Sequence, residues 1–347
     1  MEQNTPKEFI NRIYEVPKHA ELNEMPKKIM FLGPLTFGSY ESKFVKYLGN
    51  YHQILPIDYR AMSTTHMTAI IQTQMENCDE VWVSKGEIIN HRFLTDLARK
   101  NGKKSVIFFP DNFYRYPETK DFLPLYDFCF TSNTDFLDCD FPVTWMPGGF
   151  DPEDYRFAKK TEDIDLLFVG TAHPQRVPFF RKLGEFCDKN NYSFAIVGNN
   201  WQNLNMKWWK MPAVYNEGFA DVASKAKICL NYHFSLWGVN NKCFEYTAAG
   251  SCLLTDNVIG INQLFIPDEE MVTYDNFQDL TEKIRLLLKK DKRRNDTAER
   301  GKRASYQNHT IPHRVNSTLS ILAGTKPPEI QTLPIGEENR ANTEKKT

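Results

Sequence analysis

The chain has 347 residues, enough for two domains of ordinary size, because single hydrophobic cores usually stop growing before this length. A formal net charge of -1 argues against a dedicated polyanion-binding protein, although a basic patch could exist within a balanced total. No apolar run is long enough to span a membrane, and the first residues lack the apolar core of a signal peptide. We therefore expect a cytoplasmic protein with two domains.

From residue 28 the chain alternates short apolar runs with amphipathic stretches, the pattern typical of strands and helices in turn. The elements expected in the first half are strands at 28–34, 52–58, 79–85, 104–111, 126–133 and 142–149, and helices at 41–51, 66–77 and 88–102. Fully apolar strands that alternate with helices form a parallel sheet covered on both faces. Residues 1–150 are therefore predicted to form a Rossmann-like α/β domain.

The polar stretch 151–163 shows no periodicity, and we predict that it is an interdomain linker. Strand and helix patterns then resume at 164–170, 177–191, 192–198, 221–233 and 252–257, and helical stretches follow at 277–308 and 310–324. This predicts a second Rossmann-like domain over 164–324. The Pro-, Glu- and Asn-rich residues 325–347 are expected to be a disordered tail.

The predicted architecture is thus α/β, with two parallel sheets that face a central cleft. Open α/β sheets bind ligands at the carboxyl ends of their strands. Binding and catalytic residues are therefore expected in the loops that follow the predicted strands.

Cysteine and histidine spacing predicts no metal centre and no disulfide framework. The seven cysteines are an odd number, lie mostly in apolar segments and form no C-x-x-C pair, so we expect reduced core residues. His91, His173, His309 and His313 lack the spacing of zinc ligands on one helix face. No cofactor is required by the sequence, although a divalent cation such as Mg²⁺ or Mn²⁺ could assist.

A glycine-containing loop joins the first predicted strand to its helix, in "FLGPLTFGSYESKF". Gly38 precedes Ser39, which we expect to cap the helix. Such a loop suits an anion, so both residues are candidates for donor binding. Its glycine spacing matches neither the dinucleotide fingerprint nor the P-loop, and a tight turn required by backbone geometry remains the alternative.

The second predicted domain opens in the same way, with Gly170 at the end of a strand and Arg176 at the start of the next helix. Backbone N–H groups, a helix dipole and a guanidinium together match the needs of a diphosphate. The alternative is a solvated arginine on the first helical turn.

Lys242 and Glu245 lie in "NNKCFEYTAAGSCLLTDN", where small residues lead into an apolar strand. A carboxylate in this helix could accept the hydroxyls of a ribose, and Lys242 could meet a phosphate. The alternative is a lysine–glutamate pair on an exposed helix face. We favour binding, because the helix should be largely buried and a buried glutamate needs a partner that the local sequence does not supply.

These residues carry a resemblance to a known family. Asn240, Lys242, Phe244 and Glu245, followed by "AAGSCLLTDN", resemble a signature of GT-B glycosyltransferases of the CgeB-like, spore-maturation group. The elements "FVGTAHPQR", "IVGNNW" and "NHTIPHRVNSTLSIL" agree in order with that group, so the match spans roughly residues 151–322.

The resemblance implies a nucleotide-sugar donor, with UDP favoured, held by the second domain and a hydroxyl acceptor held mainly by the first. By carry-over, Glu245 would bind the donor ribose and Lys242 with Arg176 the diphosphate. Many retaining GT-B enzymes carry another glutamate eight positions before this one, and Trp237 stands there in this chain. The pattern with a single glutamate therefore fits better.

The order of elements also resembles that of a phage β-glucosyltransferase, which modifies hydroxymethylcytosine in DNA. In that enzyme an aspartate after the fourth strand of the first domain is the catalytic base, and Asp111 stands at the matching position. An inverting transfer needs one such base to take the proton of the acceptor hydroxyl. The alternative role of Asp111 is to form the turn after Pro110.

Two further segments could bind ligands. The tryptophan-rich residues 201–209 could stack a sugar or a base, although a loop anchored by tryptophans is the favoured interpretation. The basic run 289–303 would suit a phosphate backbone, but its interleaved acidic residues favour a solvated helix surface. The acceptor therefore stays open between a small molecule, glycan or protein hydroxyl and a modified DNA base, and a protein that binds a nucleotide sugar without turnover is the third hypothesis.

Overall fold

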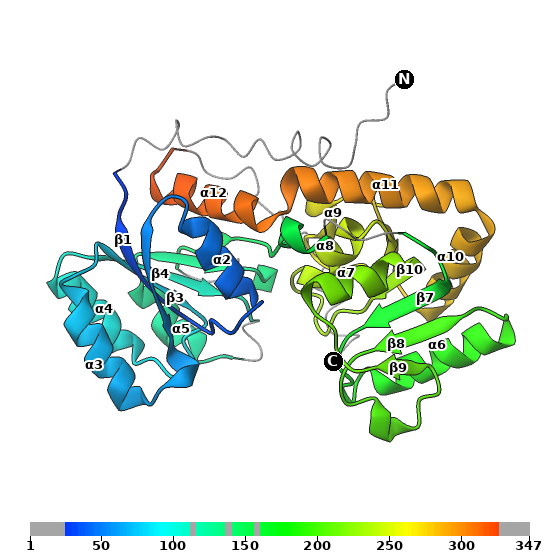
Figure 1. The fold of residues 1–347 in the computed structure, drawn as a ribbon, viewed down its shortest axis with the longest axis horizontal. Helices are drawn as coiled ribbons and strands as arrows, with labels where there is room; N and C mark the ends of the chain where they lie inside the picture. The colour runs from blue at the N-terminus through cyan, green and yellow to red at the C-terminus, as the bar shows by residue number, and fades with distance from the viewer. Residues whose placement is uncertain (1–24, 112–115, 136–140, 156–159, 326–347) are drawn as a thin grey trace. The chain divides into compact units, whose positions relative to one another are not determined.

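The computed structural model describes residues 25–111, 116–135, 141–155 and 160–325 of the chain. Its contacts divide the chain into two compact units, one of residues 1–148 with 311–347 and one of residues 149–310. Each unit contains a parallel sheet of six strands with helices packed against it (Figure 1). The predicted α/β class with two Rossmann-like sheets is therefore confirmed. In the part of the chain that is described, no helix has the length and apolar character that crossing a membrane requires.

The sheet of the first unit has the strand order β2-β1-β3-β4-β5-β6, with every pair parallel. The strands are β1 (Lys28–Gly33), β2 (Gln53–Asp58), β3 (Glu80–Ser84), β4 (Lys104–Phe109), β5 (Phe128–Thr131) and β6 (Thr144–Trp145). The helices around it are α2 (Tyr40–Leu48), α3 (Thr64–Met75), α4 (His91–Lys100) and α5 (Thr119–Phe122), with short 3-10 turns at Tyr59–Ala61 and Leu123–Leu125. β2 lies on one side of β1 and all later strands lie on the other, so the direction of the connections reverses between β1 and β3. Ligands of open α/β sheets bind at such a switch point.

Three helices of this unit begin where the sequence supplies a capping side chain. Ser39 accepts from the Ser42 N–H, Ser63 from the His66 N–H and Asn90 from the Phe93 N–H. Each bond satisfies one N–H that the first helical turn leaves without an internal partner. The predicted cap at Ser39 is thus confirmed.

The sheet of the second unit has the order β12-β11-β10-β7-β8-β9. Its strands are β7 (Ile164–Val169), β8 (Phe194–Val197), β9 (Trp209–Met211), β10 (Ala226–Asn231), β11 (Cys252–Asp256) and β12 (Val272–Tyr274). Its helices are α6 (Val177–Lys189), α7 (Asn216–Ser224), α8 (Asn241–Ala248), α9 (Ile261–Leu264), α10 (Phe277–Lys289) and α11 (Asp291–Asn308), with 3-10 turns at Pro152–Tyr155 and Gln202–Leu204. This is the order of the doubly wound dinucleotide-binding sheet, and its switch point lies between β7 and β10.

The closing helices differ from the sequence-based boundaries in two ways. The expected helical stretch 277–308 forms two helices, α10 and α11, which meet at Lys290. Helix α12 (Ile311–Leu322), which we placed in the second domain, packs instead in the first unit. Its apolar residues Ile311, Val315 and Leu319 join the core formed with Phe44 and Trp82. An apolar helix face shows that a helix packs somewhere, but it does not identify the sheet against which it packs.

The predicted linker also differs in part, because Pro152–Tyr155 forms a buried turn that groups with the second unit. Residues 156–159 within the linker, and 326–347 of the predicted tail, lie outside the described residues. The six cysteines that are described are buried, as expected for core residues, and Cys139 lies outside the described part.

Candidate functional site

Arg176 lies at the switch point of the second sheet. It immediately precedes α6, and its guanidinium donates to two carbonyl oxygens that follow different strands. Nη1 donates to Thr171 O at 3.3 Å, after β7, and Nη2 donates to Tyr232 O at 3.0 Å, after β10. The side chain therefore joins the two neighbouring strands between which the connections of the sheet reverse.

The charge of Arg176 is buried and forms no direct ion pair with a described carboxylate, although the charge of Asp256 acts on it from a greater distance. The residue is only 8% exposed, and its Nε has no hydrogen-bond partner there. Burial lowers the pKa of Arg176 to about 10. A buried cation is expensive unless an anion compensates it, so this position is suited to hold one.

An aromatic side chain covers this guanidinium. The ring centroid of Phe234 lies 3.6 Å from Cζ of Arg176, and His173 meets the same ring edge-on with centroids 4.9 Å apart. Phe234 is nonetheless 53% exposed. The cation–π contact stabilises the guanidinium charge, while the Phe234 ring itself stays accessible to solvent.

Gly170, the second predicted donor residue, ends β7 where two loops come into close contact. A Cβ at Gly170 would lie 2.7 Å from the Phe168 ring, and a Cβ at Gly198 would lie 2.1 Å from the Gly170 carbonyl oxygen. That oxygen also accepts a 2.7 Å hydrogen bond from Nε1 of Trp201. Glycine at position 198 therefore allows the loops after β7 and β8 to meet, and glycine at position 170 leaves room for the Phe168 ring.

A buried network that sequence reasoning missed holds the loop between β10 and α8. Nδ1 of His233 lies 2.6 Å from Asp256, which ends β11, and the Asp256 carboxylate also accepts from the His233 backbone N–H. Nε2 of His233 lies 3.2 Å from the backbone N–H of Asn240, which it can accept. The network fixes the start of α8 and the segment that carries Tyr232 and Phe234. "LLTD" marked Asp256 as part of the resemblance, but no local spacing links it to His233.

Lys242 and Glu245 lie on the first two turns of α8 and pair with each other. Nζ of Lys242 lies 2.7 Å from Oε2 of Glu245, and it also lies 3.9 Å from the Phe219 ring centroid. The helix is largely buried, as predicted, but the Glu245 side chain is 26% exposed. Our premise that the local sequence supplies no partner for Glu245 was wrong, because Lys242 supplies it.

In the first unit, the loop before α2 has a structural role. Gly38 adopts a left-handed φ of 78°, and Ser39 both accepts from Ser42 and donates to Pro34 O at 3.1 Å. The hydroxyl of Ser39 is thus occupied by the turn and the cap. Binding of the donor by Gly38 and Ser39 stays a prediction.

Asp111 lies just after β4, at the carboxyl edge of the first sheet, as predicted. Its side chain is 33% exposed, and Oδ2 lies 3.7 Å from Nζ of Lys85, which follows β3. A second carboxylate, Glu41, lies at the same edge and accepts from the Ser84 hydroxyl at 3.2 Å. Sequence reasoning missed Glu41, because a glutamate in the first turn of a helix is common for electrostatic reasons alone.

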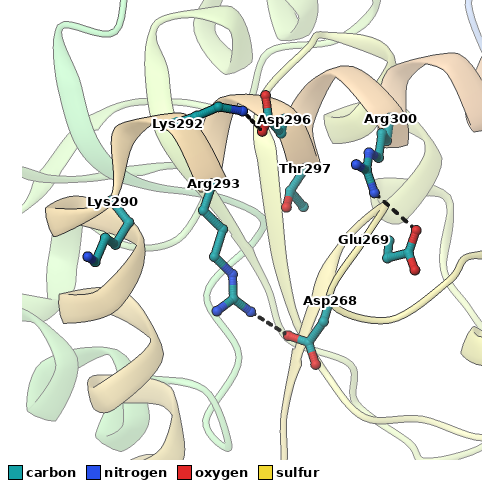
Figure 2. Close-up of a pocket in the computed structure, with 8 residues that line it drawn as sticks. All are labelled: Asp268, Glu269, Lys290, Lys292, Arg293, Asp296, Thr297 and Arg300. Carbon is teal, nitrogen blue, oxygen red and sulfur yellow. Dashed lines mark hydrogen bonds and ion pairs between the residues drawn. The ribbon is translucent and has the colours of Figure 1, made fainter.

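The other candidate binding segments are structural. Trp201 and Trp208 are buried in the second core, which supports the interpretation of a loop anchored by tryptophans. On α11, Figure 2 shows three cations that line a surface pocket and pair with acidic groups. The pairs are Lys292 with Asp296, Arg293 with Asp268 and Arg300 with Glu269. No group of three or more potential metal ligands gathers within the described ranges.

Comparisons with known proteins bear on the fold. A family model described as glycosyl transferase-like matches residues 176–320, which run from Arg176 through α12. No curated protein matches the sequence. Among solved structures, HepE of Anabaena in complex with UDP-glucose has a TM-score of 0.65 at 11% identity, covering 86% of this chain and 100% of that chain.

Two other solved structures have the same fold. An alpha-glucosyltransferase in complex with UDP and a 13-mer DNA containing an HMU base has a TM-score of 0.62 at 12% identity, covering 86% of this chain and 100% of that one. Sucrose-phosphate synthase from Thermosynechococcus elongatus has a TM-score of 0.58 at 10% identity, with coverages of 86% and 100%. The fold is that of the GT-B glycosyltransferases. The CgeB-like assignment stays a prediction.

The close contact of the two loops generates a stability prediction. Gly198→Ala should lower the free energy of unfolding by about 1–3 kcal/mol, because its Cβ would overlap the Gly170 carbonyl oxygen. Gly218→Ala is the matched control, since its Cβ has no neighbour nearer than 3.7 Å and α7 favours alanine. Urea unfolding measures both changes. Equal stability of the two variants would show that the loops do not meet as described.

Proposed function

We propose that the protein is a glycosyltransferase that moves a sugar from a nucleoside diphosphate, with UDP favoured, to a hydroxyl acceptor. The observation that carries the proposal is the buried guanidinium of Arg176 at the switch point of the second sheet, whose Nε has no hydrogen-bond partner among the described residues. A GT-B fold supplies the context, and several structural neighbours were solved with UDP or a UDP-sugar.

The diphosphate would bind at Arg176. Nε of Arg176 and the N–H of Phe179 offer donors, and the dipole of α6 adds positive potential there. The other two residues of the first turn do not, because Pro178 has no N–H and the Val177 N–H bonds to His173 O. The glycine pair Gly170 and Gly198 lets backbone come close to the same place. An anion at this position would form the direct ion pair that Arg176 does not make with any described carboxylate.

The ribose would bind at Glu245. Lys242 engages Oε2 of this carboxylate, so Oε1 remains for the ribose hydroxyls. If Lys242 also contacts a phosphate, as the resemblance implies, it must turn away from Glu245 when the donor binds. A partly exposed pair of this kind contributes little stability, so exchanging it for a ligand costs little.

The acceptor would bind in the first unit, and Asp111 is the base that the resemblance implies. One alternative acceptor is a hydroxymethylated base in DNA, which the likeness to the DNA-bound alpha-glucosyltransferase supports. The paired cations of α11 do not strengthen this alternative. Duplex DNA carrying such bases, added to the assay below, decides between the acceptor classes, and a protein that binds donor without any turnover would be a non-catalytic binder.

The proposal is tested by incubating the protein with a panel of UDP-sugars and following the release of UDP. We expect release from at least one sugar, and binding of UDP with 1:1 stoichiometry. Arg176→Met should weaken UDP binding by about 10–100-fold, because charge-assisted hydrogen bonds to the diphosphate are lost. Without ligand, its free energy of unfolding should fall by no more than about 1.5 kcal/mol, since removal of a desolvated charge offsets the lost bonds to the carbonyl oxygens.

Arg181→Met on the same helix is the control, because Arg181 is exposed and should not affect UDP binding. Calorimetry and urea unfolding provide the two readouts. Unchanged UDP affinity in Arg176→Met would remove the observation on which the proposal rests.

Glu245→Ala should raise the dissociation constant of UDP by about one to two orders of magnitude, because a carboxylate makes charge-assisted bonds to ribose hydroxyls. Glu185→Ala on the exposed face of α6 is the matched control. Affinity for inorganic pyrophosphate, which has no ribose, should change much less. Equal losses for UDP and pyrophosphate would assign Glu245 to the phosphates instead of the ribose.

A further inference from the structure

Glu41 lies at the switch point of the first sheet. It is in the first turn of α2, the helix that follows β1, and it accepts a hydrogen bond from Ser84, the last residue of β3. The connections of this sheet reverse between β1 and β3. Glu41 therefore occupies the position where an open α/β sheet presents groups to a ligand.

The surroundings of Glu41 make it a stronger base than an exposed glutamate. Burial raises the pKa of Glu41 above its ordinary value, and the charges of Lys85 and Arg60 only partly oppose this. The neighbouring Tyr40 is partly buried, and desolvation raises its pKa to about 12. Glu41 is half-buried, so solvent still reaches part of its side chain. Oε1 of Glu41 accepts from the Ser84 hydroxyl.

Asp111 differs from Glu41 in the partner of its carboxylate. Its Oδ2 faces Nζ of Lys85 at 3.7 Å, so the ammonium compensates its charge. No described cation forms an ion pair with Glu41, whose Oε1 accepts from the neutral Ser84 hydroxyl instead. At this sheet edge Asp111 is therefore held by an ammonium group, and Glu41 by a hydroxyl.

We propose that Glu41, and not Asp111, is the general base of the glycosyl transfer, an inference that rests on the function proposed above. Glu41 takes the proton of the acceptor hydroxyl as its oxygen forms the bond to the anomeric carbon. The bond between that carbon and the diphosphate oxygen breaks, and the nucleoside diphosphate leaves with the bonding electron pair. The proton on Glu41 then passes to water. Transfer by this route inverts the configuration of the anomeric carbon.

The test compares Glu41→Gln with Asp111→Asn, two isosteric changes at the same sheet edge. The substrate is UDP-glucose, or whichever UDP-sugar of the panel the wild-type protein consumes, with water or an identified hydroxyl compound as acceptor. Glu41→Gln should lower kcat by about 10²–10⁴-fold, the usual contribution of a general base, and leave UDP affinity unchanged. Asp111→Asn should lower kcat by less than about tenfold relative to the wild-type protein. Intact UDP binding shows that a variant is folded.

The dependence of kcat on pH distinguishes a general base from a residue with only a structural role. In the wild-type protein, kcat should rise with pH as Glu41 loses its proton, with a midpoint above the ordinary glutamate pKa. Ser84→Ala removes a hydrogen bond that lowers the pKa of Glu41, so the rise of kcat should move to higher pH in this variant. In Glu41→Gln the rise of kcat with pH should disappear.

The outcomes separate the two proposals. Turnover that survives in Glu41→Gln overturns the assignment of the base while the glycosyltransferase function stands, and loss in Asp111→Asn alone would assign the base to Asp111. Retention of anomeric configuration in the product would also overturn a base mechanism of this kind. A wild-type protein that consumes none of the UDP-sugars would overturn both proposals.

Discussion

At the switch point of the second sheet, the buried guanidinium of Arg176 forms no direct ion pair with a described carboxylate, and Asp256 acts on it only from a distance. Burying a cation without an anion costs free energy, and two carbonyl oxygens and an aromatic ring only partly offset that cost. The surrounding structure holds it there nevertheless. Gly170 and Gly198 bring two loops together beside it, and the His233–Asp256 pair fixes the loop that supplies Tyr232 and Phe234. We interpret this arrangement as a preformed anion-binding site, in which the ligand would supply the anion that pairs with Arg176.

The first sheet presents two carboxylates instead. Glu41 and Asp111 lie near Lys85 at the carboxyl edge, but only Asp111 forms an ion pair with it. Burial raises the pKa of Glu41, and its partner Ser84 is a neutral hydroxyl and not a cation. Anion binding in one unit and proton uptake in the other are the two tasks that a transfer from a nucleoside diphosphate to a hydroxyl requires.

Much of the fold could be predicted from the sequence, because buried parallel strands such as "KSVIFF" and "IDLLFV" are continuous apolar runs. Capping side chains such as Ser39 also marked helix starts. Helix α12 could not be assigned, since its apolar face is compatible with either core. Within the site, Arg176 was predictable from its place after a strand. The burial of Arg176, the partner of Glu245 and the His233–Asp256 pair depend on how segments distant in sequence meet, or on which rotamer a helical neighbour adopts.

We propose above all that the donor diphosphate binds at the buried guanidinium of Arg176. A crystal structure of the protein with UDP tests it most directly. Our account predicts diphosphate oxygens within hydrogen-bond distance of the Arg176 guanidinium, at the carboxyl ends of β7 and β10, with the ribose at Glu245. A diphosphate bound elsewhere, for example among the paired cations of α11 in Figure 2, with Arg176 still lacking an anion, would contradict it.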